Sequence, residues 1–433
     1  MLPKWRLAAF LLVAGTALAQ TERKLEIDPL VRELLARNPE VLAAQKRYEA
    51  ARQRPVQDGA LPDPRFSVGW NSSGNPLPGA GLGTEPVANI GAMVSQQIPY
   101  PGKRRLRAES AGKEALVEFE NYQSVQLSAI SRLKQAYYRL QHAQAMGRVL
   151  DKNRDLLTAI LRVSESRYQA GRGMQQDVLK AQTQISLLEV RRLQIEREQK
   201  ARTAEINSLL ARPVASPLPP APEPLTHPGM HGSLEQLLRA AVENSPAVRR
   251  DQREIERSET AVRLARKEYF PDFTLNGGYY NMGSMPAMYM VRMDLNVPLQ
   301  LRKRRAAVTQ QQAGVEQARS TYAADEQTIA ARIQDEWQSA ETALKLSNLY
   351  DTTVLPQAYL TLQSSLAGYE TGGVDFLSVL SNFGMVLEYE MNRHEEMQNY
   401  HLAETRMEEL AGISLDELPI TPVQARMGTE VKR

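Results

Sequence analysis

Two pairs of short segments alternate apolar and polar residues with a period of two. In the first pair, at about residues 65–98, Phe66, Val68 and Trp70 alternate with small polar residues. In the second pair, at about 273–297, apolar residues such as Val291 and Leu295 alternate with polar residues in the same way. This period predicts β-hairpins whose strands have one apolar and one polar face. Their length suits a membrane barrel with lipid outside and water inside, but the alternation alone also fits a half-buried soluble hairpin.

Long helices are expected to follow each hairpin. No proline interrupts residues 102–212, and helical sequence runs from Lys103 to about Arg167, roughly 65 residues or 95 Å at 1.5 Å per residue. Apolar and small residues on this helix are spaced alternately by four and three positions, which is the coiled-coil period, and form one stripe. A second stripe beside it begins at Ile130 and Tyr137. Two stripes predict neighbours on two sides, as in a ring of helices. The first stripe consists of Ala129, Leu133, Ala136, Leu140, Ala143, Gly147 and Leu150.

Two similar glycine turns divide these helices. Tyr168–Gln182 and Tyr369–Phe383 each begin with an aromatic residue, have a glycine three residues later, and have Val-Leu seven residues after that glycine. Glycine ends a helix by adopting the left-handed conformation at little cost. We therefore expect two hairpin tips, with the next helices starting at Asp177 and at Val374-Asp375.

The order of these features recurs, which indicates an internal repeat of about 200 residues. Asn38-Pro39 is echoed by Ser245-Pro246, and the second long helix is expected to be interrupted at Pro356. We expect a signal peptide at 1–19, repeat 1 at 20–212, a proline-rich linker at 213–232, repeat 2 at 233–413 and a polar tail at 414–433. The tips lie at 171–173 and 372–374.

Four strands cannot close a barrel, and an open sheet edge in lipid is forbidden. Three chains would supply twelve strands and leave no edge. The predicted fold class is therefore mainly α with a membrane β-barrel: two internal repeats per chain, and a trimeric twelve-stranded β-barrel continuing into a periplasmic α-helical barrel.

Composition narrows the function classes. The chain has no cysteine, which excludes disulfides, thiolate metal sites and a cysteine-linked lipid anchor. A net charge of +3 over 433 residues gives no reason to expect nucleic acid. Lys4 and Arg6 precede an apolar stretch and Ala17-Leu18-Ala19, the order of a secretory signal, with a membrane-anchoring helix as the alternative. No catalytic motif is apparent, so we expect neither enzymatic activity nor a cofactor.

Several short motifs, several of which occur once in each half of the chain, together resemble the TolC-like outer-membrane efflux channel family. The resemblance covers nearly all of the mature chain. The resemblance implies a homotrimer in the outer membrane of a Gram-negative bacterium, extending into the periplasm. It also implies a periplasmic adaptor (membrane fusion protein) and an inner-membrane resistance-nodulation-division pump as partners, besides outer-membrane lipid. The hairpin Asn281–Met290 resembles the heavy-metal branch that exports copper and silver, or cobalt, zinc and cadmium. The motifs are Asn38-Pro39, Ser245-Pro246, Leu61-Pro62, Phe270-Pro271, Ile98–Arg104, Asn207–Pro213 and both Tyr-x-x-Gly tips.

The resemblance assigns the tips to adaptor docking, although their glycines could serve the turn alone. The expected docking residues are Tyr168, Gly171, Arg172, Gly173, Tyr369, Gly372, Gly373 and Val374. Members of the family close the periplasmic aperture with two acidic residues nine and twelve positions after the second aromatic residue. This chain has Ser378 and Ser381 there, and Asp177 and Lys180 in the first repeat, so its aperture departs from the pattern.

Strand parity suggests further candidates. Asn89, Arg292, Asp294 and Asn296 are expected to face the barrel lumen. Thioether sulfur suits Cu(I) or Ag(I), so a methionine cluster is a candidate metal contact, with apolar filling as the alternative. That cluster is Met282, Met285, Met288 and Met290, while Met293 is expected to face lipid. The basic runs Lys103–Arg107 and Arg302–Arg305 are expected to reach water and lipid headgroups at the membrane interface.

The expected function is that of a passive exit duct for heavy-metal cations. A drug or solvent efflux channel of the same fold is one alternative. A secreted periplasmic coiled-coil structural protein without a barrel is the alternative from another class.

Overall fold

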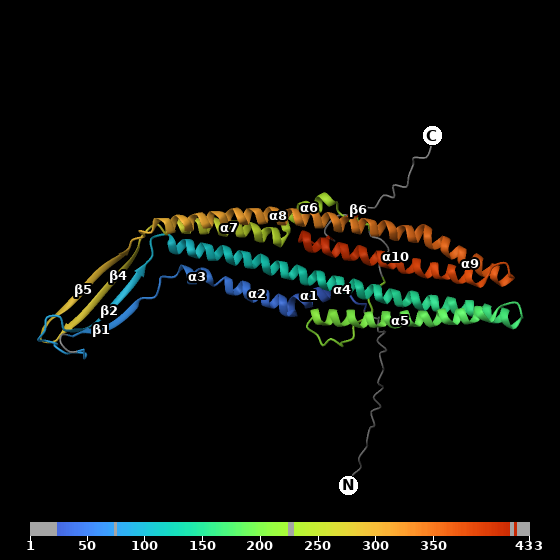
Figure 1. Ribbon diagram of the computed structural model, residues 1–433, viewed down its shortest axis with the longest axis horizontal. Coiled ribbons are helices and arrows are strands. Elements are labelled where there is room, and N and C mark those ends of the chain that lie inside the picture. Colours follow the sequence, from blue (N-terminus) through green and yellow to red (C-terminus); the bar gives the residue numbers. More distant parts are fainter. Residues whose placement is uncertain (1–23, 73–75, 224–228, 416–419, 422–433) are drawn as a thin grey trace, which may run out of the picture.

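The protein is a long rod with a β-sheet at one end and helical tips at the other (Figure 1). The computed structural model describes residues 24–72, 76–223, 229–415 and 420–421. The expected signal peptide, at 1–19, lies outside the described residues, as does most of the expected tail. Within the described ranges, no helix is both long and apolar enough to cross a membrane.

Four antiparallel strands form the sheet at the end of the rod. Their order is β1 (Arg65–Asn71), β2 (Asn89–Ile98), β4 (Asp272–Met282) and β5 (Met285–Asn296). The two hairpins therefore join through β2 and β4, and β1 and β5 are left as open edges. Apart from a register shift between Tyr280 and Met282, the strands alternate with a period of two, so one face is apolar and includes Val291, which is 83% exposed.

Five long helical segments form the rod. They are α4 (Lys103–Gln169), α5 (Gln175–Leu209), α8 (Leu301–Leu349), α9 (Leu355–Thr371) and α10 (Phe376–Ala411). The 67 residues of α4 span about 100 Å at 1.5 Å per residue. A π-helical turn, η1 (Tyr350–Val354), joins α8 to α9. The α-helix is thus interrupted directly before Pro356, near the expected position, while the rod continues through η1 into α9.

Shorter helices precede each hairpin. They are α1 (Ile27–Arg37), α2 (Pro39–Ala51) and α3 (Arg54–Gly59) in the first half, and α6 (Leu234–Asn244) and α7 (Pro246–Lys267) in the second. The break between α1 and α2 is capped by Asn38, whose Oδ1 accepts hydrogen bonds from the amides of Glu40 (2.9 Å) and Val41 (3.2 Å). Below the sheet, α2 and α3 pack on α4, α4 packs on α7, and α7 packs on α8.

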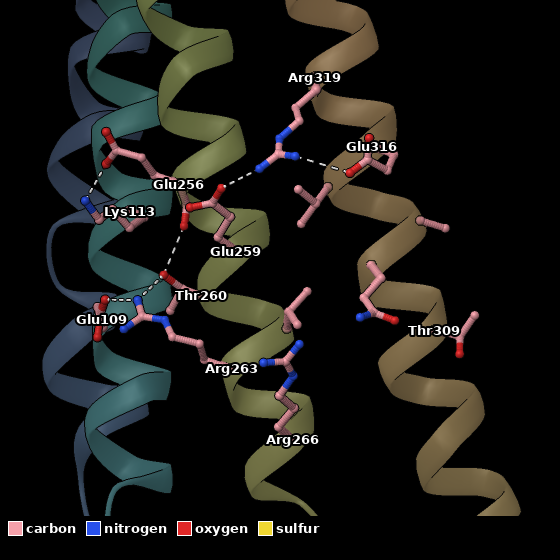
Figure 2. Close-up of a pocket in the computed structure, with 14 residues that line it drawn as sticks. Glu109, Lys113, Glu256, Glu259, Thr260, Arg263, Arg266, Thr309, Glu316 and Arg319 are labelled. Atoms are coloured by element: carbon pink, nitrogen blue, oxygen red, sulfur yellow. Dashed lines mark hydrogen bonds and ion pairs between the residues drawn. The ribbon is translucent and has the colours of Figure 1, made fainter.

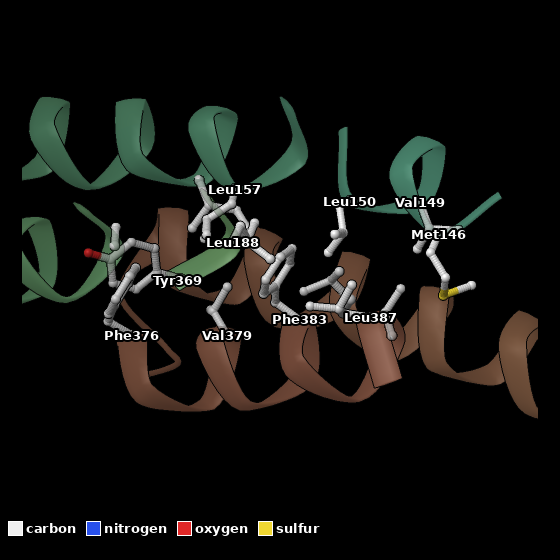
Figure 3. Close-up of a cluster of buried hydrophobic side chains, with 14 residues drawn as sticks. Met146, Val149, Leu150, Leu157, Leu188, Tyr369, Phe376, Val379, Phe383 and Leu387 are labelled. Atoms are coloured by element: carbon white, nitrogen blue, oxygen red, sulfur yellow. The ribbon is translucent and has the colours of Figure 1, made fainter. Parts of the chain in front are cut away.

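Buried apolar residues form three clusters along the rod rather than one compact core. The cluster nearest the tips joins α4 and α5 to α9 and α10, and includes Leu157, Leu188, Phe383 and Leu387 (Figure 3). In another cluster Ala129, Leu133, Ala136 and Leu140 are fully buried, as the coiled-coil period predicts.

Described parts of the expected linker and tail make defined backbone contacts. Met230–His231 (β3) pairs with Ile420–Thr421 (β6). The Pro220 carbonyl accepts a 3.0 Å hydrogen bond from the amide of Leu25, and the Pro222 carbonyl accepts one of 2.9 Å from Gln141 on α4. The extended linker is therefore fastened to α4.

Candidate functional site

The two tips end their helices with glycines in the left-handed conformation. Gly171 has φ 69° and Gly372 has φ 90°. In the second tip the amide of Gly373 donates a 2.8 Å hydrogen bond to the carbonyl of Gly368, which closes the turn. The second returning helix begins at Phe376 with Asp375 as its N-cap, as expected, and the first begins at Gln175, two residues before Asp177. Asp177 instead lies within the first turn of α5, where a carboxylate favours the positive end of the helix.

Tyr369 connects the two tips. Its side chain is only 3% exposed, its ring centroid lies 4.4 Å from the Arg167 guanidinium carbon, and its hydroxyl donates a 3.2 Å hydrogen bond to Asp177. The ring of Phe376 packs against that of Tyr369 in a tilted arrangement, with ring centroids 5.5 Å apart. Burial raises the pKa of Tyr369, and the nearby Asp177 carboxylate adds to the rise. The phenol therefore stays protonated and serves as a donor across the tip contact.

The corresponding residue of the first tip, Tyr168, is 47% exposed and so lies on the outer surface. Arg167, next to it, donates a 3.1 Å hydrogen bond to the carbonyl of Arg172 across the first turn. One guanidinium thus braces its own turn and stacks on the other tip. The expected docking residues gather at one end of the rod, but the two aromatic residues differ in burial.

The expected aperture residues do not form one cluster within a single chain. Asp177 is engaged with Tyr369, and Ser378 donates a hydrogen bond to Asp375 at the start of α10. Lys180 and Ser381 are exposed. Ser381 lines a cavity of about 840 Å³ between α5 and α10, together with exposed apolar residues such as Leu187 and Val190.

At the other end of the rod, the sheet register gathers the polar candidates on one face. Asn276 is paired with Arg292, and Thr274 with Asp294. Arg292 and Asp294 form a 3.0 Å ion pair, and Asn276 donates a 2.8 Å hydrogen bond to Asp294. Asn89 is buried and accepts a 3.3 Å hydrogen bond from Asn71, while Asn296 lies opposite Asp272.

A model of the outer membrane efflux protein family matches residues 30–212 and 237–412, which is more than half of the chain. The chain belongs to the outer membrane efflux protein family. The two matched ranges each contain one hairpin and one tip, so the match covers both repeats. A comparison with curated protein sequences finds no match.

Solved structures of outer-membrane channels share the fold of this efflux protein. The CusC channel aligns with a TM-score of 0.76 at 15% identity, covering 95% of this chain and 99% of CusC. VceC of Vibrio cholerae aligns with a TM-score of 0.76 at 16% identity (90% and 96% covered). OprN aligns with a TM-score of 0.71 at 20% identity (90% of both chains). The family match and these structural similarities confirm the expected family and fold class. At sequence identities this low, the similarity to each solved structure shows only that the fold is shared.

The methionine candidates of this efflux protein lie near the β4–β5 turn. Met282 is paired with Met285, and Met288 and Met290 share the polar face. The strand register adds Met93 to this group of methionines, since Met93 on β2 and Met290 on β5 flank Gly278 of β4 from opposite sides. The sequence alone did not point to Met93. The described residues contain no group of histidine and carboxylate side chains that could hold a metal ion.

Tyr280 shapes the space around these methionines. A Cβ on Gly91 would lie 2.2 Å from the Tyr280 ring, and one on Gly278 would lie 2.8 Å from it, so the ring covers both glycines. The ring thus lies over the glycine that separates Met93 from Met290.

The expectation that the whole run Lys103–Arg107 reaches headgroups is wrong. Lys103 is 1% exposed, and its Nζ contacts Glu268 (3.2 Å), Asp272 (2.9 Å) and the carbonyl of Phe270 (2.9 Å). Arg104 donates a 2.9 Å hydrogen bond to the carbonyl of Gly59. These contacts arise because the first turn of α4 lies beside the α7–β4 junction, about 165 residues away in sequence.

Proposed function

We propose that this protein is the outer-membrane channel of a tripartite efflux system, a passive exit duct driven by an inner-membrane pump through a periplasmic adaptor. The observation that carries the proposal is the two-faced sheet with open edges at one end of a helical rod about 100 Å long. Such a sheet suits a membrane only as part of a closed barrel.

Three copies form the proposed assembly. The unpaired backbone groups of β1 and β5 require partners in lipid, and joining three four-stranded sheets edge to edge gives twelve strands. Exposed apolar residues on the helices support side-by-side packing of copies. These include Leu179, Leu187, Val190 and Leu193 on α5, Leu360 on α9, and Leu377 and Met385 on α10.

The proposed barrel has Val291 and its apolar neighbours toward lipid, and Arg292, Asp294 and Asn296 toward the lumen. The proposed cargo is a soft metal cation, which the methionines on the polar face would contact weakly. The likeness to CusC shows only the fold. Drug or solvent export through the same fold is the second candidate. A deletion strain tested against copper, silver, zinc, cobalt and a panel of drugs separates the two.

The tips are the proposed docking site for the adaptor, with Asp177, Lys180, Ser378 and Ser381 at the periplasmic aperture. Replacing Gly171 and Gly372 with valine forces a branched residue into the left-handed region and should reshape both tips. We expect export to be lost while trimers persist in the outer membrane. Normal export by this variant would remove the docking role.

Gly112→Val is the matched control for this experiment. Gly112 lies within α4, and an added Cβ there would meet no atom within 4 Å. The control should therefore export normally. Export is measured as growth under toxic metal or drug, and assembly is measured by membrane fractionation and cross-linking.

A further inference from the structure

A charged pocket of about 680 Å³ lies between α4, α7 and α8, a few turns from the sheet (Figure 2). Most of its charges are matched. Arg263 pairs with Glu109, Lys113 pairs with Glu256, and Arg319 lies 3.1 Å from Glu259 and 3.3 Å from Glu316. Arg266 is the exception: among the described residues, no carboxylate lies in ion-pair range, and Figure 2 shows its side chain beside α7 without a partner.

The pocket opens on the side of the helical layer that continues the apolar face of the sheet. Residues of an α-helix are about 100° apart, so Glu268, two residues after Arg266, points to the opposite side of α7. Glu268 binds Lys103, which also binds Asp272. Asp272 is paired with Asn296 on the polar face of the sheet. Because Glu268 marks the polar side, Arg266 lies on the apolar side.

Two more unmatched arginines extend the pocket toward the sheet. Arg302 and Arg305 line a second cavity, of about 520 Å³, that shares Thr309 with the first. Both are exposed, and neither has a carboxylate partner within the described ranges. They lie at the start of α8, whose first turn has no acidic residue to offset the positive end of the helix.

Apolar side chains adjoin this basic site on the membrane side. Leu299 is 83% exposed and Leu301 is 58% exposed, directly before Arg302. They follow β5, whose apolar face presents Val291 and Leu295, within a few residues along the chain. A ligand of the site is therefore expected to combine a phosphate with hydrocarbon chains, because guanidinium groups bind phosphate through paired hydrogen bonds.

We propose that Arg266, Arg302 and Arg305 bind the phosphate headgroup of a phospholipid in the periplasm-facing leaflet of the outer membrane. This inference rests on the proposed function, since it needs the sheet to lie in a bilayer. The lipid chains lie along Leu299 and Leu301, and the headgroup reaches the pocket below them. Free phosphate lacks the apolar half of this contact and binds more weakly.

The test measures how much phosphatidylglycerol the purified oligomer retains in detergent, by native mass spectrometry, for the wild type and for Arg266→Gln/Arg302→Gln/Arg305→Gln. Diacylglycerol with the same chains is the probe that lacks phosphate, and inorganic phosphate is the probe that lacks chains. Each arginine near anionic lipid contributes about a fivefold factor, so the triple variant should lose on the order of 100-fold in affinity.

The matched control removes the same charge elsewhere, as Arg197→Gln/Lys200→Gln/Arg332→Gln. These three residues are exposed and lie on α5 and on α8, away from the pocket. The control should bind lipid as the wild type does, and a triple Arg→Lys variant should recover part of the loss. Millimolar inorganic phosphate should not displace the lipid.

Two results would refute the lipid site and leave the proposed channel function unaffected: unchanged lipid retention in the triple glutamine variant, or an equal loss of lipid in the control. Equal retention of diacylglycerol and phosphatidylglycerol by the wild type would also overturn it. A wild-type chain that fractionates as a soluble monomer would refute the proposed function as well. Fractionation before the lipid measurement distinguishes the two failures.

Discussion

The contact between Tyr369 and Asp177 gives a sharp test of how the two tips hold together. Tyr369→Phe removes the hydroxyl, which donates the 3.2 Å hydrogen bond to Asp177 and also has a hydrogen bond with Ser164. The ring remains, with its packing on Phe376 and its stacking under Arg167. The variant therefore removes the polar contacts of the ring and keeps its packing, and the cycle with Asp177→Asn separates the hydrogen bond to Asp177 from the contact with Ser164.

The magnitude follows from the partners. A hydrogen bond to a charged group contributes roughly 1.5–3 kcal/mol, and the lower value applies because Asp177 is partly exposed. A loss of about 1.4 kcal/mol corresponds to a tenfold change in an equilibrium constant. Tyr369→Leu additionally removes the stacking under Arg167, worth about 1 kcal/mol more.

Amide hydrogen exchange reports the free energy of local opening at residues 167–175 and 369–376. We expect about tenfold faster exchange there in Tyr369→Phe, with no change in the sheet. Asp177→Asn completes a double-mutant cycle. If Tyr369→Phe has the same effect with Asp177 or Asn at position 177, the hydrogen bond does not couple the tips. Tyr168→Phe, at the exposed residue of the first tip, is the control and should be silent.

Two further tests address the sheet and the rod. Val291→Lys should cost roughly 2–4 kcal/mol of barrel stability on the lipid face, whereas Asn296→Lys should be tolerated; equal fractions of assembled protein in the outer membrane would contradict the face assignment. Burial, with smaller contributions from Arg393 and His142, lowers the pKa of His394 from 6.5 to about 4. The neutral imidazole stabilises the folded state fully above pH 6.5, and this contribution, about 3 kcal/mol, is lost as the pH falls toward 4. Denaturation midpoints of the wild type should fall over this window, and those of His394→Gln should fall less; parallel pH profiles would refute the assignment.

Local patterns predicted the elements well. The strand faces follow from two-residue alternation, because each residue of a strand points opposite to its neighbour whatever the strand pairs with. The glycines of the tips and the break at Asn38-Pro39 likewise depend on residues close in sequence. These features place the hairpins and tips before any long-range contact is known.

Contacts between distant segments could not be predicted in this way. Lys103 looks like an exposed interface residue until α7 and β4 are placed beside it. Met93 joins the other methionines only through the pairing of β2 with β4. The short pairing of β3 with β6 has no local signal, since two residues carry no period. The partnership of Tyr369 and Asp177 also needs two helices that meet only in the fold.

The π-helical turn η1 resets the spacing of buried positions along the α8–α9 rod. Ala340 and Ser347 are buried seven residues apart, and two further steps of seven would lead to Thr361. Thr361 is exposed, and Leu362 and Tyr369 are buried instead, one residue later. The π-helical turn η1 lies between Ser347 and Leu362 and accommodates one residue more than an α-helical turn does, which accounts for the shift by one position. Removing one residue from 350–354 would take away this additional residue and rotate Tyr369 by about 100° relative to α8, away from Asp177. The geometry of the second tip is thus set some twenty residues before it.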